Sequence, residues 1–390
     1  MMSEREFIYL DNAATTWPKP ASVTDAITDY YRNVGAAAGR GSSSRSAKVD
    51  RTIEQCRVAL AKLINVNSGS IVFCFNGTDG LNTAISGMIR NGDHVVASDI
   101  EHNSVLRPIH ELASQGRISF DLVKSNNGAI SAESVANSIV DSTRLFCVSH
   151  VSNVTGIEQD IVAIVAACRK ANPDSFVIVD AAQSVGHISV DASEIDCDIL
   201  VSSGHKGLMG PLGTGFVWLS DRASEEITPV RFGGTGSGSE SIEQPLVLPD
   251  RLESGSPNVG GIFGLLQGVQ FIAERGLEEI AKQELRLANR LIESLRIMEG
   301  VQLYGVENPN RTGVISFNIE NQDPQTVGTL LDVEFGIQLR AGYHCAPLMH
   351  QALGTDKIGG TLRASPSVFN TERDIDKLVA GVNQLVAQLD

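Results

Sequence analysis

Residues 176–218 read FVIVDAAQSVGHISVDASEIDCDILVSSGHKGLMGPLGTGFVW, and this stretch indicates the fold. An apolar run over 176–179 ends in an acid, and a second over 199–201 ends in the string SSGHKG. Short apolar runs bounded by Gly, Ser and Asp are typical of buried strands in an α/β sheet. Ligands of such sheets bind beyond the carboxyl ends of the strands. We therefore expect one crevice to contain the polar residues that follow the two runs: Asp180, Gln183, Ser203, His205 and Lys206.

These residue types suit pyridoxal phosphate. This cofactor needs an amine for a Schiff base, a carboxylate that keeps its pyridine nitrogen protonated, and hydrogen-bond donors for its phosphate. Lys206 offers the amine, Asp180 the carboxylate, and Ser203 with His205 part of the phosphate site. A lone lysine in such a loop is usually solvated. The acid at the end of the preceding strand, with Gln183 between them, favours the cofactor.

The strings DAAQ at 180–183 and SGHK at 203–206 resemble the class V aminotransferase family, a branch of the fold-type I pyridoxal-phosphate enzymes. The chain alternates strand-like and helical segments, which indicates a doubly wound, mainly parallel α/β sheet. The resemblance adds a smaller α+β domain at the C-terminal end. We expect residues 17–255 to form the large cofactor-binding domain, and residues 1–16 with 256–390 to form the small one.

Length and composition agree with two globular domains. The 390 residues exceed one typical domain, and 42 % hydrophobic with 20 % charged residues excludes a disordered chain. The net charge of −15 argues against a nucleic-acid partner.

The six cysteines form no C-x-x-C pair, so neither a zinc ribbon nor a thioredoxin-type motif is visible. Cys74, Cys147 and Cys168 lie inside apolar runs as small core residues, and this usage fits the reducing cytoplasm. The first residues lack the features of a signal peptide, and no apolar run approaches the ~20 residues of a membrane span. We expect a cytoplasmic protein without a membrane segment.

Two segments in the first hundred residues resemble family signatures. YLDNAATT at 9–16 is similar to an N-terminal loop that covers the active site, which implies that Asn12 and Ala14 lie near the substrate. NGTDG at 76–80 follows a strand and opens a helix, whose free N–H groups suit a phosphate. Alone, Thr78 would be an ordinary helix cap. The resemblance implies a phosphate-binding turn that includes Asp79, where relatives often have Glu.

Further cofactor contacts are implied by the resemblance. His102 would stack on the pyridine ring, and Asn153, in HVSNVTG, is placed to hydrogen-bond the cofactor or the substrate. Thr235, in a glycine-rich loop, would reach the partner's phosphate in a homodimer, so that each site is complete only in the dimer. One departure concerns substrate contacts: relatives usually carry a histidine three residues after Arg40, where this chain has Ser43.

The C-terminal half carries a reactive cysteine and two arginines. Cys345 lies in the polar, glycine-flanked loop LRAGYHCAP (339–347) beside a histidine, a setting that exposes a thiol as a nucleophile. Arg363 suits bidentate capture of a substrate carboxylate, and Arg340 is a second candidate for substrate binding. A metal held by His344, Cys345 and His350 is a weak alternative, and we expect none.

The string RAGYHCA with the downstream RAS (363–365) and FNT (369–371) resembles cysteine desulfurases, in the SufS-like and selenocysteine lyase-like group. The resemblance implies conversion of L-cysteine to L-alanine. Arg363, with Asn12 and Asn153, would hold the carboxylate, Lys206 would move the α-proton, and Cys345 would take the sulfur as a persulfide for an acceptor protein. Either His102 or His344 would assist the proton transfers.

Two alternatives stay open. Another class V enzyme, such as an aminotransferase, a selenocysteine lyase or a C–S lyase, would need Lys206 and Arg363 but not Cys345. A degenerate sulfur carrier or scaffold protein would not need Lys206, Asp180 and His205, which this chain retains.

Overall fold

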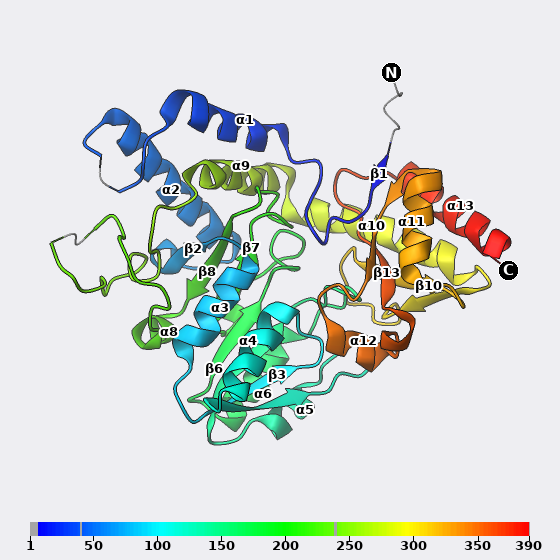
Figure 1. Cartoon of the computed structure of the whole chain (residues 1–390), viewed down its shortest axis with the longest axis horizontal. Helices are drawn as coiled ribbons and strands as arrows, with labels where there is room; N and C mark the ends of the chain where they lie inside the picture. Colours follow the sequence, from blue (N-terminus) through cyan, green and yellow to red (C-terminus); the bar gives the residue numbers. More distant parts are fainter. Residues whose placement is uncertain (1–6, 40, 238–239, 390) are drawn as a thin grey trace.

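The computed structural model describes residues 7–39, 41–237 and 240–389, which form a seven-stranded sheet, a four-stranded sheet and a two-stranded sheet with helices around them (Figure 1). The larger sheet has seven strands in the order β2-β8-β7-β6-β5-β3-β4. Strands β3 to β7 run parallel to one another, and β8 runs antiparallel to both its neighbours. The strand bounds are β2 Ile71–Cys74, β3 Asp93–Ser98, β4 Ile118–Val123, β5 Thr143–Ser149, β6 Phe176–Asp180, β7 Ile199–Ser203 and β8 Gly215–Leu219.

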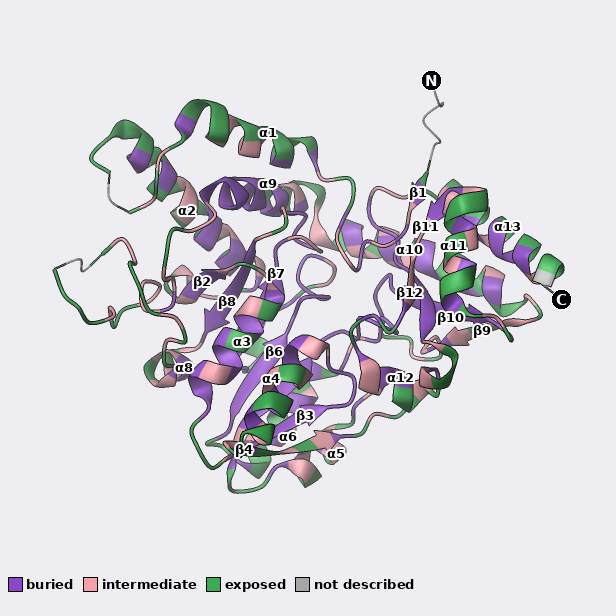
Figure 2. Ribbon diagram, in the orientation of Figure 1, coloured by how far each residue is buried: buried purple, intermediate pink, exposed green. Residues whose placement is uncertain are grey.

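Helices cover both faces of this sheet. One face packs on α3, α4 and α8, and the other on α2, α5, α6, α7 and α9, so that the central strands are buried on both sides (Figure 2). Double burial explains why the central strands are continuous apolar runs rather than alternating ones. The helix bounds are α1 Ala21–Asp29, α2 Ser44–Leu63, α3 Gly77–Met88, α4 Asn103–Ser114, α5 Ala132–Ser138, α6 Ile161–Ala171, α7 Ala192–Ile195, α8 Asp221–Glu226 and α9 Val259–Arg275.

The smaller sheet is antiparallel, with the order β12-β13-β10-β9. Two amphipathic helices, α10 and α13, pack beside it. Helix α11 packs on β11, β12 and β13. Strand β1 pairs in parallel with β11, so the start of the chain joins this part of the molecule. The bounds are β1 Ile8–Tyr9, β9 Val301–Tyr304, β10 Ile315–Ile319, β11 Ile337–Gln338, β12 Arg340–Gly342, β13 Thr361–Ala364, α10 Leu277–Arg296, α11 Pro324–Phe335, α12 Pro347–Leu353 and α13 Glu372–Leu389.

The fold class is therefore confirmed: a large, mainly parallel α/β sheet and a smaller C-terminal α+β layer. The boundaries after residues 16 and 255 stay predictions. Helix α9 packs on α1 and α2, beside the large sheet. Gly276, with a φ of 85°, separates α9 from α10. None of the described helices has the length and apolarity needed to cross a membrane.

Two helices have irregular starts or ends. Helix α6 begins only at Ile161, because Val151 and Ile157 before it form short bridges with Glu158 and Arg311. Helix α1 changes after Asp29 into a π-helical turn over Tyr30–Val34.

We predict that Phe216→Ala lowers the free energy of unfolding by about 3–5 kcal/mol, because Phe216 is completely buried in β8 and its removal leaves a cavity. Urea denaturation followed by circular dichroism measures this loss. Val58→Ala is the matched control, since Val58 is half exposed on α2 and its loss should change stability by no more than about 0.5 kcal/mol. Equal effects of the two substitutions would contradict the core assignment.

Candidate active site

A cavity of about 320 Å³ lies where the strands of the large sheet end and the small sheet begins. Its walls come from the ends of β5, β6 and β7, the start of α3, the N-terminal segment and the turn after β12. Most of the predicted site residues line this cavity: Ala14, Thr78, His102, Asn153, Asp180, Gln183, Ser203, His205, Lys206, Arg340, Cys345 and Arg363. Residues more than 300 positions apart in the chain therefore meet in one place.

The floor of the cavity holds a buried carboxylate and a buried amine. Asp180 ends β6, and Lys206 follows β7, the next strand of the sheet. Burial raises the pKa of Asp180, while the charge of Lys206 opposes that rise. Burial lowers the pKa of Lys206, and Asp180 is the largest opposing influence. The two groups thus offset part of each other's desolvation, and burial shifts the Lys206 amine towards its neutral, nucleophilic form.

The first turn of α3 provides an anion site at one end of the cavity. Helix α3 begins at Gly77, whose N–H donates to Ser203 Oγ over 3.0 Å, and a Cβ at Gly77 would lie 2.7 Å from the same atom. Thr78 Oγ1 lies 2.6 Å from Ser104 Oγ. His205 Nδ1 is buried and has no hydrogen-bond partner among the described residues. A helix N-terminus with hydroxyl groups and an unpaired imidazole nitrogen suits a phosphate.

His102 is held in a defined neutral form. The backbone N–H of Ser104 donates to His102 Nδ1 over 3.0 Å, so Nδ1 carries no proton and Nε2 does. Burial, followed by the charges of Lys206 and Arg363, lowers the pKa of His102 to about 3. An uncharged imidazole is the form that can lie flat against an aromatic ring system without bringing another positive charge beside Lys206.

The N-terminal segment fixes the backbone beside the lysine. The carbonyl oxygen of His205 accepts three hydrogen bonds, from Thr16 N at 3.0 Å, Thr15 Oγ1 at 3.1 Å and Lys19 Nζ at 2.7 Å. Thr16 Oγ1 also donates to the carbonyl of Lys206 over 2.7 Å. Gln183 Nε2 donates to the Ala13 carbonyl over 2.9 Å. The loop that carries the lysine is thus fixed by a segment that begins in β1, the partner of β11.

Arg363, on β13, brings a guanidinium from the smaller sheet to the cavity. Its guanidinium is almost completely buried, and Nη1 donates to the Asn153 carbonyl over 2.9 Å. Nη2 donates to Asp11 Oδ1 over 2.8 Å, and Nε has no partner among the described residues. Arg340, half exposed on β12, lies on the same side. A buried guanidinium with an unused donor is suited to a carboxylate ligand.

Cys345 is presented by a short turn between β12 and α12. His344 and Cys345 have φ values of 47° and 59°, a left-handed backbone that bulky residues rarely adopt. The turn is fixed on both sides: Asn153 Nδ2 donates to the His344 carbonyl over 2.6 Å, and the N–H of Asn103 donates to the Cys345 carbonyl over 2.7 Å. The thiol-bearing residue is exposed and also lines the cavity. It therefore faces both the site and the surroundings.

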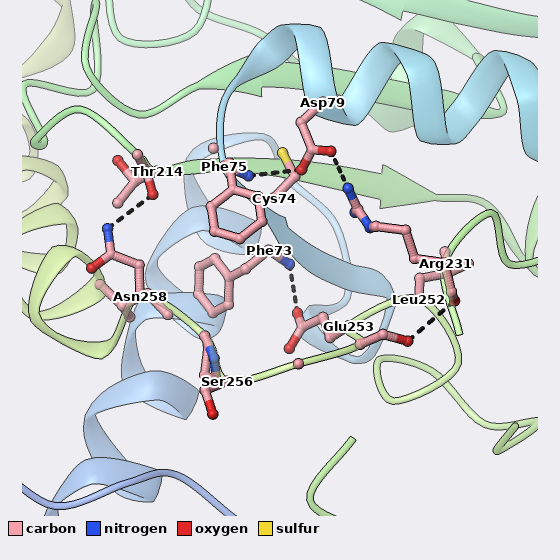
Figure 3. Close-up of a pocket in the computed structure, with 16 residues that line it drawn as sticks. Phe73, Cys74, Phe75, Asp79, Thr214, Arg231, Leu252, Glu253, Ser256 and Asn258 are labelled. Carbon is pink, nitrogen blue, oxygen red and sulfur yellow. Dashed lines mark hydrogen bonds and ion pairs between the residues drawn. The ribbon is translucent and has the colours of Figure 1, made fainter. Parts of the chain in front are cut away.

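Three predicted site residues do not line the cavity. Asn12 Nδ2 donates to the Ser365 carbonyl over 2.8 Å and tethers the N-terminal segment. Asp79 forms an ion pair with Arg231 and accepts from Phe75 N over 2.9 Å, so its carboxylate faces a second cavity, of about 50 Å³ (Figure 3). Thr235 is half-buried on the loop between α8 and α9 and hydrogen-bonds within that loop, to the Ser237 carbonyl. Their predicted roles stay predictions.

The structure accounts for Ser43 and for the two histidines of the metal alternative. Ser43 accepts from Ser46 N and caps α2, whereas Arg40 lies outside the described residues. His344 Nε2 pairs with Thr361 Oγ1, and His350 Nδ1 pairs with Thr355 Oγ1. Among the described residues no group of three or more His, Cys, Asp or Glu side chains is arranged to hold a metal.

The structure adds residues that the sequence did not single out. Asp11 is the carboxylate partner of Arg363, and Ser104 contacts both Thr78 and His102. Glu101 is buried beneath the sheet edge, where it accepts from Ser149 N and Ser149 Oγ, and burial raises its pKa to about 7. The positions of Asp11 and Glu101 beside recognised site motifs were a usable signal, but their partners lie far away in the sequence.

Known proteins share this fold and are similar in sequence over nearly the whole chain. Residues 8–378 match the family described as aminotransferase class-V. The fold and this match define the class: the chain belongs to the class V aminotransferase family, which depends on pyridoxal phosphate. A probable cysteine desulfurase from Methanothermobacter thermautotrophicus is 35% identical over 96% of this chain and 93% of its own length. A cysteine desulfurase from Salmonella agona is 34% identical over 97% of this chain and 93% of its own length.

Solved structures agree with the sequence relatives. The apo structure of a cysteine desulfurase from Thermococcus onnurineus has a TM-score of 0.91 at 31% identity, over 98% of this chain and 95% of that one. A cysteine desulfurase from Escherichia coli has a TM-score of 0.87 at 27% identity, with the same coverage. Within its family, this protein therefore groups with the cysteine desulfurases.

We predict that Cys345 reacts with iodoacetamide at least about tenfold faster than any other cysteine of the native protein, because a thiol must be accessible and ionised to react. Cys345 is exposed, whereas burial raises the pKa values of Cys56, Cys74 and Cys197. Peptide mass spectrometry over a time course measures the rates. In urea all six cysteines should react at similar rates. Equally fast native labelling of a second cysteine would contradict this assignment.

Proposed function

We propose that this protein converts L-cysteine to L-alanine and receives the substrate sulfur on Cys345 as a persulfide, with pyridoxal phosphate as its cofactor. The observation that carries the proposal is that Lys206, Arg363 and Cys345 all open onto one cavity. An aminotransferase would use the first two residues but has no need of an exposed thiol there. The cysteine desulfurases similar to this chain support the same choice of substrate.

The residues present fit the cofactor. Lys206 would bind it covalently, Asp180 would pair with its ring nitrogen, and His102 would lie on its ring. The phosphate would take the start of α3, where Thr78, Ser203 and the unpaired Nδ1 of His205 meet. When bound, pyridoxal phosphate supplies a sink for the electrons of bonds broken at the substrate.

The protein side of the reaction follows from the positions of three groups. Arg363 binds the carboxylate of L-cysteine, with Asn153 beside it, and this fixes the orientation of the substrate. Lys206, with a pKa lowered by burial, takes the proton from the α-carbon and returns one to the product. The thiolate of Cys345 attacks the substrate sulfur, whose bond to carbon breaks. One thiol and L-cysteine thus become one persulfide and L-alanine, and no external oxidant is required.

We predict that Cys345→Ala reduces alanine formation from L-cysteine at least about a hundredfold, because the substrate sulfur then has no thiolate to receive it. Alanine is quantified by chromatography, and cofactor content by absorption of the purified protein. Cys74→Ala is the control: this half-buried cysteine lies outside the cavity, and the substitution should leave the rate unchanged. If Cys345→Ala retained full alanine and sulfide production, the role of this thiol would be wrong.

The persulfide would pass to an acceptor protein as part of the same proposal. Cys345 is exposed, and its turn is fixed by hydrogen bonds to Asn103 and Asn153, so the acceptor must approach a stationary sulfur. All six cysteines are free, which supports the reducing, cytoplasmic setting expected from the sequence.

We further infer a homodimer in which Thr235 contacts the phosphate at the partner's site. The loop between α8 and α9 extends away from the body of the molecule beside α2 and α8 (Figure 1). It exposes large apolar side chains, at Phe232, Ile242, Leu246 and Val247, which are typical of a surface that another chain covers. The Asp79–Arg231 ion pair anchors the base of this loop to α3 (Figure 3). Asp79 would then act on the loop rather than on the cofactor.

A hybrid experiment tests the shared site. Thr235→Asp should inactivate the partner's site, because its carboxylate would repel the phosphate, and Lys206→Ala should inactivate its own. In a co-expressed heterodimer, the subunit with Thr235→Asp keeps Lys206 and receives an intact Thr235. We expect each homodimer to be nearly inactive and the purified heterodimer to recover up to about half of the normal activity. Absence of recovery in an intact heterodimer would contradict the shared site.

A further inference from the structure

We propose that Asp11 is a positioning residue that makes this site selective for substrates with a single carboxylate. This inference rests on the proposed role of Arg363 in binding the substrate carboxylate. Asp11 would hold the guanidinium in place and offset one of two arginine charges. The subsite would then present one uncompensated positive charge, which matches the α-carboxylate of a neutral amino acid and disfavours substrates with a second, acidic group.

The geometry places Asp11 between two arginines. Asp11 Oδ1 accepts from Arg363 Nη2 over 2.8 Å, and Asp11 Oδ2 lies 3.9 Å from Arg340 Nη1. Arg363 and Arg340 both line the cavity, whereas Asp11 does not. The carboxylate therefore contacts the arginines from outside the cavity, and the sides of both arginines that line the cavity are left for a ligand.

The position of Asp11 is fixed by its backbone. It follows β1, forms a parallel bridge with Ser365, and accepts a hydrogen bond on its carbonyl from the Tyr9 hydroxyl over 3.1 Å. Asn12 N donates to the Ser365 carbonyl, which fixes the same turn. Asp11 is largely buried, with 19% of its side chain exposed, so water screens its charge weakly.

Among the described residues near Arg363, Cys345 is the one other group that supplies an opposing charge, and its thiolate raises the pKa of Arg363 less than Asp11 does. Burial raises the pKa of Tyr9 to about 12, so the phenol is neutral. Burial lowers the pKa values of His102 and His344, and both imidazoles are neutral as well. Asp180 lies beside Lys206 and acts on that amine. The balance of charge around the carboxylate subsite is therefore set mainly by Arg363, Arg340 and Asp11, with a smaller influence of Cys345.

The test compares L-alanine with L-aspartate as ligands of the holoenzyme. The two amino acids share the α-amino and α-carboxylate groups and differ by one side-chain carboxylate. Isothermal titration calorimetry gives both dissociation constants. We expect the wild-type protein to prefer L-alanine, and Asp11→Asn to shift the ratio of the two constants by about tenfold towards L-aspartate, the order expected for one partly screened charge. The amide oxygen of Asn can still accept from Arg363, so the arginine keeps its position.

Control variants separate charge from structure. Asp11→Glu restores the charge and should restore the wild-type ratio. Asp25→Asn removes one negative charge from the exposed side of α1 and should leave the ratio unchanged. If Asp11→Asn does not fold, Arg340→Gln provides the opposite change, and its ratio should move away from L-aspartate. A purely structural role of Asp11 predicts that both affinities fall together.

The inference is overturned if Asp11→Asn binds the cofactor and shows the wild-type ratio, or if Arg340→Gln leaves the ratio unchanged. Alanine release from L-cysteine is measured on the same preparations. If Asp11→Asn shifts the ratio of the two dissociation constants but the wild-type protein makes no alanine from L-cysteine, the role of Asp11 stands and the proposed reaction is rejected. If the wild-type protein releases alanine normally but Asp11→Asn leaves the ratio unchanged, the proposed reaction stands and the role of Asp11 is rejected.

Discussion

The site depends on the mutual compensation of a buried carboxylate and a buried amine at the ends of two neighbouring strands. Removing either Asp180 or Lys206 from water is unfavourable, and each lowers the cost of burying the other. This compensation works only if the two strand ends lie side by side, which the parallel pairing of β6 with β7 ensures. The doubly wound sheet is thus a scaffold for one electrostatic pair, and the N-terminal segment, the start of α3 and the turn after β12 close around it.

The same principle recurs at the other end of the cavity. There the buried charge is Arg363, and its compensation comes from Asp11 on one side and the Asn153 carbonyl on the other. At both pairs, Asp180 with Lys206 and Arg363 with Asp11, the protein offsets part of the cost of burying a charge and leaves at least one of the polar groups for a ligand. A fully compensated site would be more stable but would bind a charged ligand weakly, so the incomplete pairing is the chemically useful feature.

The sequence alone was sufficient for the parts of the site that follow directly from strand ends. Asp180, Gln183, Ser203, His205 and Lys206 were predicted to share a crevice, because the order of apolar runs and polar termini fixes their edge of the sheet. The Arg363–Asp11 pair could not be predicted in this way, since its members are 352 residues apart and no local pattern encodes their contact. Asp79 shows that a position next to a motif does not fix the direction of a side chain. It follows Thr78 in the chain, but its carboxylate accepts from Phe75 N and pairs with Arg231.

The pairing of β1 with β11 has a consequence for how the chain reaches its active form. Residues 8 and 9 pair with residues 337 and 338, which are synthesised much later, and Asp11 forms a bridge with Ser365, just after β13. The large sheet can assemble during synthesis from strands that are close in sequence. The first strand, however, has no partner until most of the chain has left the ribosome. The lysine loop is therefore fixed last, and an incomplete chain with a folded large sheet would still lack a finished catalytic centre.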